Sequence, residues 1–246
     1  MNDRPPSREW FREWFGDEYL ALYPHRDEAE AALAVRLYAR LFGIPNGPVL
    51  DLACGAGRHL RELLSLEIDA LGLDLSMVLL AEARRLEPAS RLVRGDMRQL
   101  PIGDRCLAGL TSFFTSFGYF EDEQDDARVV AEIRRVLRPG GNWMLDFFNA
   151  DRVRRDLVPR DTKRLGERVV TQSRRIDGDM VVKTIQVEAD GGAPELFEER
   201  VRLYDPDALS GLLQAGGLAV TGRFGSYRGD DFDVDSERLI LAGVVR

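Results

Sequence analysis

Residues 49–60 read VLDLACGAGRHL, and this stretch decides the fold. A short apolar run over 49–52 leads into a turn with two glycines, Gly55 and Gly57, after which the chain becomes charged and helical. This order predicts a buried strand, a tight turn and the start of a helix. Glycines there let the backbone approach a ligand and present N–H groups to it. The alternative is a strand-to-helix turn without a ligand, because a lone pair of glycines is a weak signal.

Strand and helix patterns alternate on both sides of this turn. The apolar spacing predicts helices over 27–42, 58–66, 76–86, 123–137 and 205–216, and strands over 48–53, 69–75, 90–96, 106–114, 142–148, 218–225 and 237–246. Ser76 is a suitable N-cap for the third helix. Strands that alternate with helices in this way indicate a parallel sheet with right-handed crossovers.

The pattern changes between residues 163 and 203, where polar and apolar residues alternate. Gly178 and Gly192 each follow a residue suited to a hairpin turn. We therefore expect an α/β protein with a Rossmann-like, doubly wound, mostly parallel seven-stranded sheet and an inserted antiparallel β flap. A single domain over 1–246 would carry an N-terminal helical lid over 1–42 and the flap over 163–203.

The composition narrows the class of protein. A formal net charge of −8 argues against a protein that coats nucleic acid. The chain has no apolar run of about 20 residues and no apolar signal core near its start, so we expect a cytoplasmic protein without a membrane partner. Two cysteines, Cys54 and Cys106, fit a reducing compartment. The histidines His25 and His59 have no metal-ligand spacing around them, and we expect no metal.

Two acids follow later strands and indicate a nucleoside. Asp74 ends the second strand, roughly 20 residues after the glycines, where a carboxylate can bind ribose hydroxyls. It could instead be a solvated acid or cap the next helix, since Ser76 is close. Asp96 ends the third strand and suits an adenine amino group, with Met97 against the ring. Leu60 stands where a dinucleotide fingerprint has its third glycine, which weakens a pyrophosphate interpretation.

With these residues in place, the chain resembles the class I S-adenosylmethionine-dependent methyltransferases, from about residue 19 to the last strand. The insertion after the fifth strand is similar to that of sugar amine N-methyltransferases and glycine N-methyltransferases. The stretches that carry the resemblance are LDLACGAGRH (50–59), LGLDLS (71–76), VRGDMRQLP (93–101), GLTSFFTSFGYF (109–120) and EIRRVLRPGGNWMLDFFN (132–149).

The resemblance implies S-adenosyl-L-methionine as cofactor and an in-line methyl transfer, for which the protein mainly positions reactants and excludes water. Ala53 departs from the glycine of many members, a change expected to have little effect. Arg26 would pair with the cofactor carboxylate, or be a solvated charge. The other implied cofactor residues are Ala53, Gly55, Gly57 and Phe113 for the methionine part, Asp74 for the ribose, and Asp96 and Met97 for adenine. Asp51, Leu75 and Met77 are also expected to contact the cofactor.

Aromatic residues near the chain start have two interpretations. Tyr19 and Tyr23 are four residues apart and share a helical face, where they could face a sulfonium or simply pack. The aromatic stripe at 10–15 is typical of a core helix, with a substrate box as the alternative.

The acceptor site is expected near Phe114, Phe117 and Tyr119. His59 and Tyr119 are the evident proton acceptors there, although His59 could serve only in packing. No catalytic residue is assigned, because an amine acceptor needs no strong base once it is deprotonated.

A basic run over 152–175 is interrupted by acids. It is either a mixed solvated surface or an attractor for an anionic substrate such as a nucleotide-linked sugar. We expect the flap to determine substrate choice rather than cofactor affinity. The alternative is a flap that only covers the edge of the sheet or makes a dimer contact.

The main functional hypothesis is N- or O-methylation of a small molecule by a monomer or homodimer. A nicotinamide-dependent oxidoreductase is disfavoured by Leu60, by the Asp96 motif and by the lack of a Tyr-x-x-x-Lys pair. An RNA methyltransferase is disfavoured by the charge, and no nucleic-acid partner is expected. A non-catalytic nucleoside-cofactor-binding protein with the same fold stays open.

Overall fold

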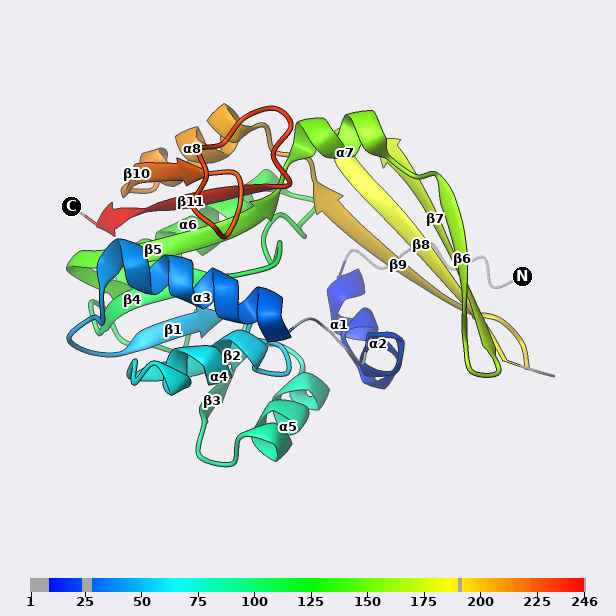
Figure 1. Cartoon of the computed structure of the whole chain (residues 1–246), viewed down its shortest axis with the longest axis horizontal. Helices are drawn as coiled ribbons and strands as arrows, with labels where there is room; N and C mark the ends of the chain where they lie inside the picture. Colours follow the sequence, from blue (N-terminus) through cyan, green and yellow to red (C-terminus); the bar gives the residue numbers. More distant parts are fainter. Residues whose placement is uncertain (1–8, 24–27, 190–191, 246) are drawn as a thin grey trace.

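The computed structural model describes residues 9–23, 28–189 and 192–245, and it contains two β-sheets joined by a small helical segment (Figure 1). The larger sheet has seven strands in the order β10-β11-β5-β4-β1-β2-β3. Its strands are β1 (Val49–Leu52), β2 (Ala70–Asp74), β3 (Arg91–Arg94), β4 (Leu107–Ser112), β5 (Leu137–Phe148), β10 (Leu218–Phe224) and β11 (Arg238–Val245).

The direction of the strands makes this sheet doubly wound. β1 pairs in parallel with β2 on one side and with β4 on the other, while β11 is antiparallel to both β5 and β10. The order of strands therefore reverses at β1, and ligands of such sheets bind at the carboxyl end of the strands beside this switch point. The predicted seven-stranded, mostly parallel sheet is confirmed.

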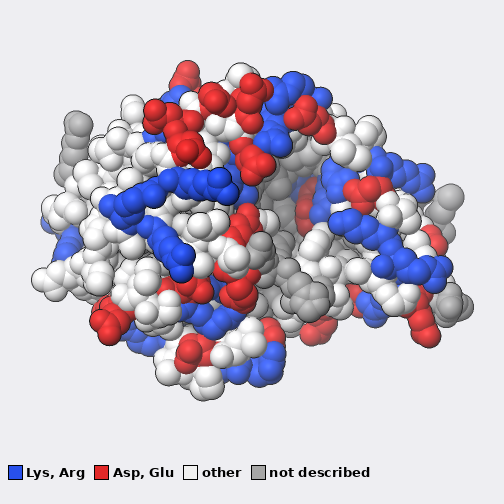
Figure 2. Space-filling model, in the orientation of Figure 1, with Lys and Arg blue, Asp and Glu red and all other residues white. Residues whose placement is uncertain are grey.

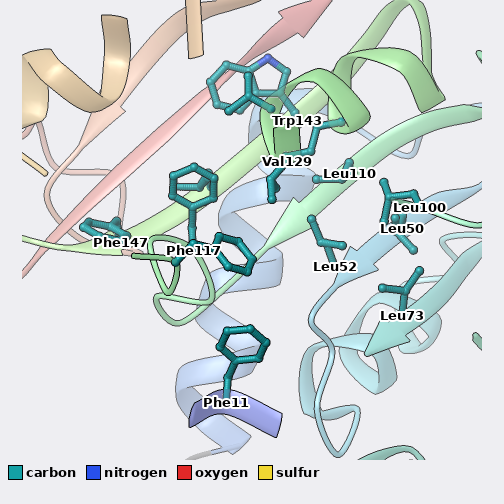
Figure 3. Packing of buried hydrophobic residues seen from close by; sticks show 14 of the residues in the cluster. Phe11, Leu50, Leu52, Leu73, Leu100, Leu110, Phe117, Val129, Trp143 and Phe147 are labelled. Carbon is teal, nitrogen blue, oxygen red and sulfur yellow. The ribbon is translucent and has the colours of Figure 1, made fainter. Parts of the chain in front are cut away.

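Helices cover both faces of the sheet because successive strand residues point to opposite sides. Val49 packs in one hydrophobic cluster with α3 (Glu28–Phe42) and α4 (Arg58–Ser65). Leu50 packs in the other cluster with α6 (Glu123–Val136) and α8 (Pro206–Ala215) (Figure 3). Sequence signals fix several helix starts: Ser76 Oγ accepts a hydrogen bond from the Leu79 amide, and Asp122 caps α6 in the same way. The helix that follows Ser76 is α5 (Met77–Leu86).

The predicted flap is a separate four-stranded antiparallel sheet. Its strands are β6 (Arg160–Leu165), β7 (Arg168–Asp177), β8 (Met180–Glu188) and β9 (Glu195–Arg202). It thus begins three residues before the expected boundary and ends one residue earlier. Gly178 has φ +61°, which the tight turn between β7 and β8 requires.

One strand boundary and one helix differ from the sequence prediction. β5 starts at Leu137, directly after α6, because Leu137 already pairs with Leu107 before the register shifts. A short helix, α7 (Ala150–Asp156), precedes the flap and was not predicted. Its cap is Asn149, whose side chain accepts hydrogen bonds from the next turn.

The predicted lid over 1–42 separates into two parts. The described lid, residues 9–23, contains α1 (Trp10–Trp14) and α2 (Asp17–Leu22), and it lies between the large sheet and the flap (Figure 1). Helix α3 instead packs on α4 as part of the main helical layer. The lid segment is therefore much shorter than the pattern suggested, because the apolar face of α3 belongs to the core.

Candidate cofactor and acceptor cavity

A cavity of about 1260 Å³ opens where the carboxyl ends of the parallel strands face the lid and the flap. It brings together residues that are far apart in the sequence. The predicted site residues that line it are Tyr19, Tyr23, Ala53, Gly55, Asp74, Leu75, Asp96, Met97, Phe113, Phe114 and Tyr119.

Four predicted site residues do not line this cavity. Phe117 is 2% exposed and belongs to the core, while the Met77 side chain is 57% exposed at the surface. Asp51 is buried within β1. Gly57 serves the packing of the turn, since a Cβ on it would lie 3.1 Å from the Ala83 Cβ. Arg26 lies outside the described residues.

The glycine turn is more strained than its sequence suggests. Gly55 and Gly57 have φ values of +54° and +78°, as the prediction requires, but Ala53 also has φ +58°. An L-residue in this left-handed region costs roughly 1–2 kcal/mol because its Cβ crowds the following carbonyl. No sequence pattern indicated this strain, and the expectation that alanine has little effect here stays a prediction.

Asp74 both supports the turn and lines the cavity. Its two carboxylate oxygens accept hydrogen bonds of 2.8 Å, one from the Gly55 amide and one from the Ser76 amide. Burial raises the pKa of this carboxyl despite those bonds. A carboxylate has about four acceptor positions, so acceptor capacity for ligand hydroxyls remains.

Asp51 lies beneath the turn with an incomplete set of partners. One oxygen accepts a 3.3 Å hydrogen bond from the Thr111 hydroxyl, and the described residues offer no partner to the other. Burial raises the pKa of Asp51 to about 7. The side chain therefore titrates near neutral pH close to the turn.

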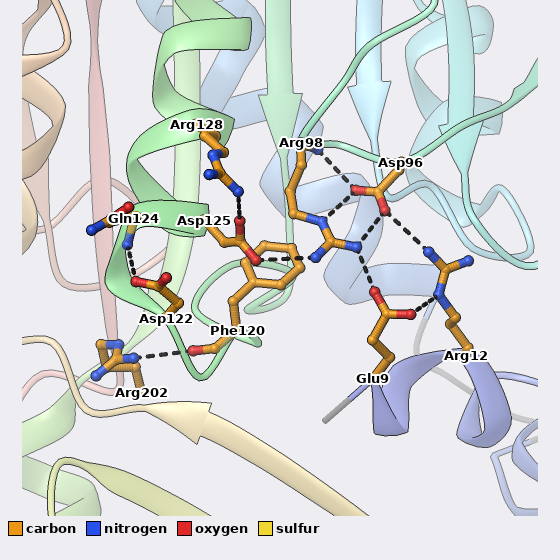
Figure 4. Close-up of polar contacts among 10 residues, drawn as sticks. All are labelled: Glu9, Arg12, Asp96, Arg98, Phe120, Asp122, Gln124, Asp125, Arg128 and Arg202. Atoms are coloured by element: carbon orange, nitrogen blue, oxygen red, sulfur yellow. Dashed lines mark hydrogen bonds and ion pairs between the residues drawn. The ribbon is translucent and has the colours of Figure 1, made fainter. Parts of the chain in front are cut away.

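Asp96 is already engaged by an arginine (Figure 4). Arg98 donates to both Asp96 oxygens, at 3.0 and 2.7 Å, and also contacts Glu9 of the lid segment at 2.7 Å. Burial acts to raise the pKa of Asp96, but the hydrogen bonds from Arg98 outweigh it and leave the pKa lowered. Through Arg98, Asp96 thus connects the lid segment to the edge of the large sheet, in addition to its predicted role beside adenine.

The aromatic lid residues pack against each other and against the loop after β4. The Tyr19 and Tyr23 rings have centroids 5.2 Å apart, and Phe15 stacks on Tyr119 at 5.9 Å. The core interpretation of the stripe holds for its buried members Trp10, Phe11 and Trp14, although Trp10, Phe11 and Phe15 also line the cavity.

The loop after β4 carries two consecutive left-handed residues, Phe114 and Thr115, each with φ +58°. The buried Asp146 holds them: its carboxylate accepts from the Phe114 amide at 2.6 Å and its carbonyl from the Thr115 amide at 3.0 Å. Arg238 makes two hydrogen bonds to the same carboxylate. No sequence pattern indicated this cluster, whose members come from different strands.

His59 is 5% exposed and stacks on Phe113 with ring centroids 4.4 Å apart. It lines the cavity, so it both packs and faces the site.

The flap contributes one face of its sheet to the cavity. Side chains of alternate residues on its strands point toward the cavity. The alternating sequence predicted that the flap has such a face, but not which residues it contacts. The inward residues that line the cavity are Asp161, Lys163, Arg174, Val181, Lys183, Glu199 and Val201.

Most of the basic run is paired on a mixed surface, where acidic and basic side chains interleave (Figure 2). Arg154 pairs with Asp205, and Arg155 with Asp235. Three members of the run, Arg152, Lys163 and Arg174, line the cavity, and Arg174 is paired with Asp161 at 2.5 Å.

Membrane-spanning helices and metal-binding clusters are both absent from the described part of the chain. Residues 9–23, 28–189 and 192–245 contain no helix that is both long and apolar enough to cross a membrane. The same ranges hold no cluster of three or more His, Cys, Asp or Glu side chains arranged for a metal ion.

Comparison with known proteins finds a methyltransferase domain in part of the chain. Residues 49–141 match the family model described as "Methyltransferase domain". A dTDP-3-amino-3,4,6-trideoxy-alpha-D-glucopyranose N,N-dimethyltransferase from Streptomyces venezuelae is 35% identical over 46% of this chain and 50% of its own. The chain spans about half the length of the curated relatives it matches.

Solved structures match over almost the whole chain. A S-adenosylmethionine-dependent methyltransferase from Clostridium acetobutylicum has a TM-score of 0.80 at 19% identity, covering 93% of this chain and 98% of its own. The sugar N-methyltransferase KedS8 from a Streptoalloteichus species has a TM-score of 0.73 at 23% identity, covering 94% of each chain. That match is long enough to include most of the flap.

Residues 49–141 therefore match a methyltransferase domain, and the fold of the chain is that of solved S-adenosylmethionine-dependent methyltransferases. A sugar N-methyltransferase is among the solved structures that share this fold, and the predicted subgroup, including the likeness to glycine N-methyltransferases, stays a prediction.

Proposed function

We propose that the chain transfers a methyl group from S-adenosyl-L-methionine to a small-molecule acceptor, with an amine as the favoured acceptor group. One observation carries the proposal: a single cavity gathers the strained glycine turn, Asp74 and the lid tyrosines. Its volume, about 1260 Å³, exceeds the roughly 300–1,000 Å³ of typical small-molecule sites, so it has room for a cofactor and an acceptor together.

The residues present fit the cofactor. Asp74 retains acceptor capacity for ribose hydroxyls, and Leu75 and Met97 offer apolar surface for a base. The rings of Tyr19 and Tyr23 offer π-faces that attract a cation. When bound, the cofactor supplies an electrophilic methyl group on a positive sulfur. The chain positions the two reactants and keeps water out, since lid and flap close over the site.

Acceptor chemistry is proposed from the relatives and the cavity wall. Two relatives of this sequence are named as N,N-dimethyltransferases of dTDP-linked amino sugars. An amine is a nucleophile once it is deprotonated, so strong general-base catalysis is not required. His59 and Tyr119 line the cavity and are the groups proposed to accept that proton.

Lys163 favours an acceptor with an anionic group. It lines the cavity, and no ion pair joins it to another described residue within 4.0 Å.

A cytoplasmic location is also proposed, in keeping with the free thiols of Cys54 and Cys106.

The test is a screen of amines with methyl-labelled cofactor. It would compare free amino sugars, nucleotide-linked amino sugars, amino acids and small peptides, and include an RNA arm. Label transfer to a small amine supports the proposal, whereas transfer to RNA alone would replace it with the RNA methyltransferase alternative. Cofactor binding without transfer to any arm would favour the non-catalytic alternative.

A further inference from the structure

A chain of hydrogen bonds joins the flap to the lid segment. The Lys183 ammonium donates to the Tyr23 hydroxyl oxygen at 2.8 Å and pairs with Glu199 at 3.2 Å. The other Glu199 oxygen accepts from the Trp14 indole N–H at 2.7 Å. Gln172 also donates to the Tyr23 oxygen, at 3.3 Å. Flap residues therefore hold the lid segment at two places, Trp14 at the end of α1 and Tyr23 just after α2.

The flap sheet itself presets this arrangement. Lys183 and Glu199 are directly opposite each other in the register of β8 and β9, which places their side chains on the same face. Their side chains are 18% and 21% exposed, so the pair is sheltered from solvent. Trp14 is 1% exposed and lies against Phe197 of the same strand as Glu199, with ring centroids 4.8 Å apart.

The held residues belong to the cofactor side of the cavity. Tyr23 packs on Tyr19, and both line the cavity together with Lys183 and Glu199. The Lys183 ammonium is also 5.4 Å from the centroid of the Tyr23 ring, so its charge sits beside the surface proposed to face the sulfonium. Glu199 partly neutralises that charge.

We propose that Lys183 and Glu199 are positioning residues of the cofactor site: from the flap, they hold Tyr23 and Trp14 so that the lid segment closes the cavity. The flap then contributes to cofactor affinity, and not only to acceptor choice as the sequence suggested. The effect on affinity rests on the proposed function, while the anchoring of the lid segment does not.

The experiment is a double-mutant cycle with Lys183→Met and Tyr23→Phe, measured in the intact chain. Calorimetry with S-adenosylmethionine should show about 10-fold weaker binding for Lys183→Met, the size of one lost hydrogen bond to a charged group. Because Lys183 acts through the Tyr23 hydroxyl, the double variant should be within about 2-fold of the weaker single variant. Parental affinity in Lys183→Met, or effects that multiply, would overturn the proposal.

Amide hydrogen exchange without ligand provides the second readout. Lys183→Met and Glu199→Gln should each accelerate exchange in residues 9–23 by about 10-fold and leave residues 49–65 unchanged. Arg175→Met is the matched control, because it removes a positive charge from an exposed position of the same sheet. Unchanged exchange in the lid segment would refute the anchoring. A parent chain that binds no S-adenosylmethionine would refute the proposed function instead, and exchange alone would then decide the anchoring.

Discussion

The Asp74 carboxylate accepts hydrogen bonds from two backbone amides and also borders the cavity, so its removal should affect both folding and binding. Asp74→Ala should weaken S-adenosylmethionine binding by about 1.5–3 kcal/mol, the range for hydrogen bonds to a charged group. Calorimetry measures this change. Asp122→Ala is the control, because it removes the cap of α6 away from the cavity. Equal affinity in the parent and Asp74→Ala would show that Asp74 is only a structural group.

Asp51 should make stability depend on pH. Its pKa in the folded chain is raised by burial to about 7, from an unfolded value near 3.9. The folded state therefore favours the protonated form, and this contribution to stability is present below about pH 4 and is lost as the pH rises to about 7. A shift of about 3 units corresponds to at most about 4 kcal/mol.

The measurement is urea unfolding of the parent and Asp51→Asn between pH 4 and 8. Asparagine cannot ionise, so the difference in unfolding free energy between the two chains should change in favour of the variant as pH rises. The buried Asp126, whose pKa is raised to about 6, is present in both chains and cancels in this difference. Two parallel stability curves would show that Asp51 does not titrate in this range.

Ala53 gives a prediction of the opposite kind, in which a substitution is tolerated. Ala53→Gly removes the roughly 1–2 kcal/mol of left-handed strain but adds about 0.5–1 kcal/mol of unfolded-state entropy. The variant should therefore be between equal in stability and about 1.5 kcal/mol more stable. Urea unfolding measures this, with Ala89→Gly in the loop before β3 as the control for the entropy term alone. A clear loss of stability in Ala53→Gly would contradict the backbone geometry.

At the scale of elements, local signals predicted the sheet and helices well. Ser76 caps α5 as expected, and the two-residue alternation revealed the flap. The missing parts depend on contacts between distant segments. Helix α3 has the same amphipathic sequence pattern whether it covers a ligand site or packs on α4. Only the tertiary structure shows that it packs on α4. Lys183 and Glu199 were missed for the same reason. The alternation of polar and apolar residues predicts which face of the flap they share, but not that they contact Tyr23 and Trp14 of the lid segment.

The flap as an element should be needed for turnover. Replacement of residues 160–202 by a short Gly-Ser bridge should leave the seven-stranded sheet folded, because the two hydrophobic clusters on its faces lie mostly outside the flap. It should abolish methylation of the acceptor found in the screen, since one wall of the cavity is lost. Circular dichroism checks folding, and a label-transfer assay checks activity. Methylation at the parental rate by a folded, shortened chain would exclude a role in acceptor recognition.

At the scale of the whole molecule, the large sheet, the lid segment and the flap enclose one site at the switch point of the sheet. The sequence located the glycine turn and the acids on the sheet, because these follow from strand ends and residue types. The lid and flap walls arise from packing between segments more than 140 residues apart, as in the contact of Trp14 with Glu199. Such contacts leave no local pattern in a sequence.

The most direct test of the account is calorimetric titration of the intact chain with S-adenosylmethionine, with its demethylated thioether product and with NAD. We expect one molecule of either of the first two ligands to bind per chain, and NAD not to bind, because Leu60 replaces the third glycine of a dinucleotide turn while Asp74 stays available to a ribose. Tight binding of NAD without binding of S-adenosylmethionine would contradict the account.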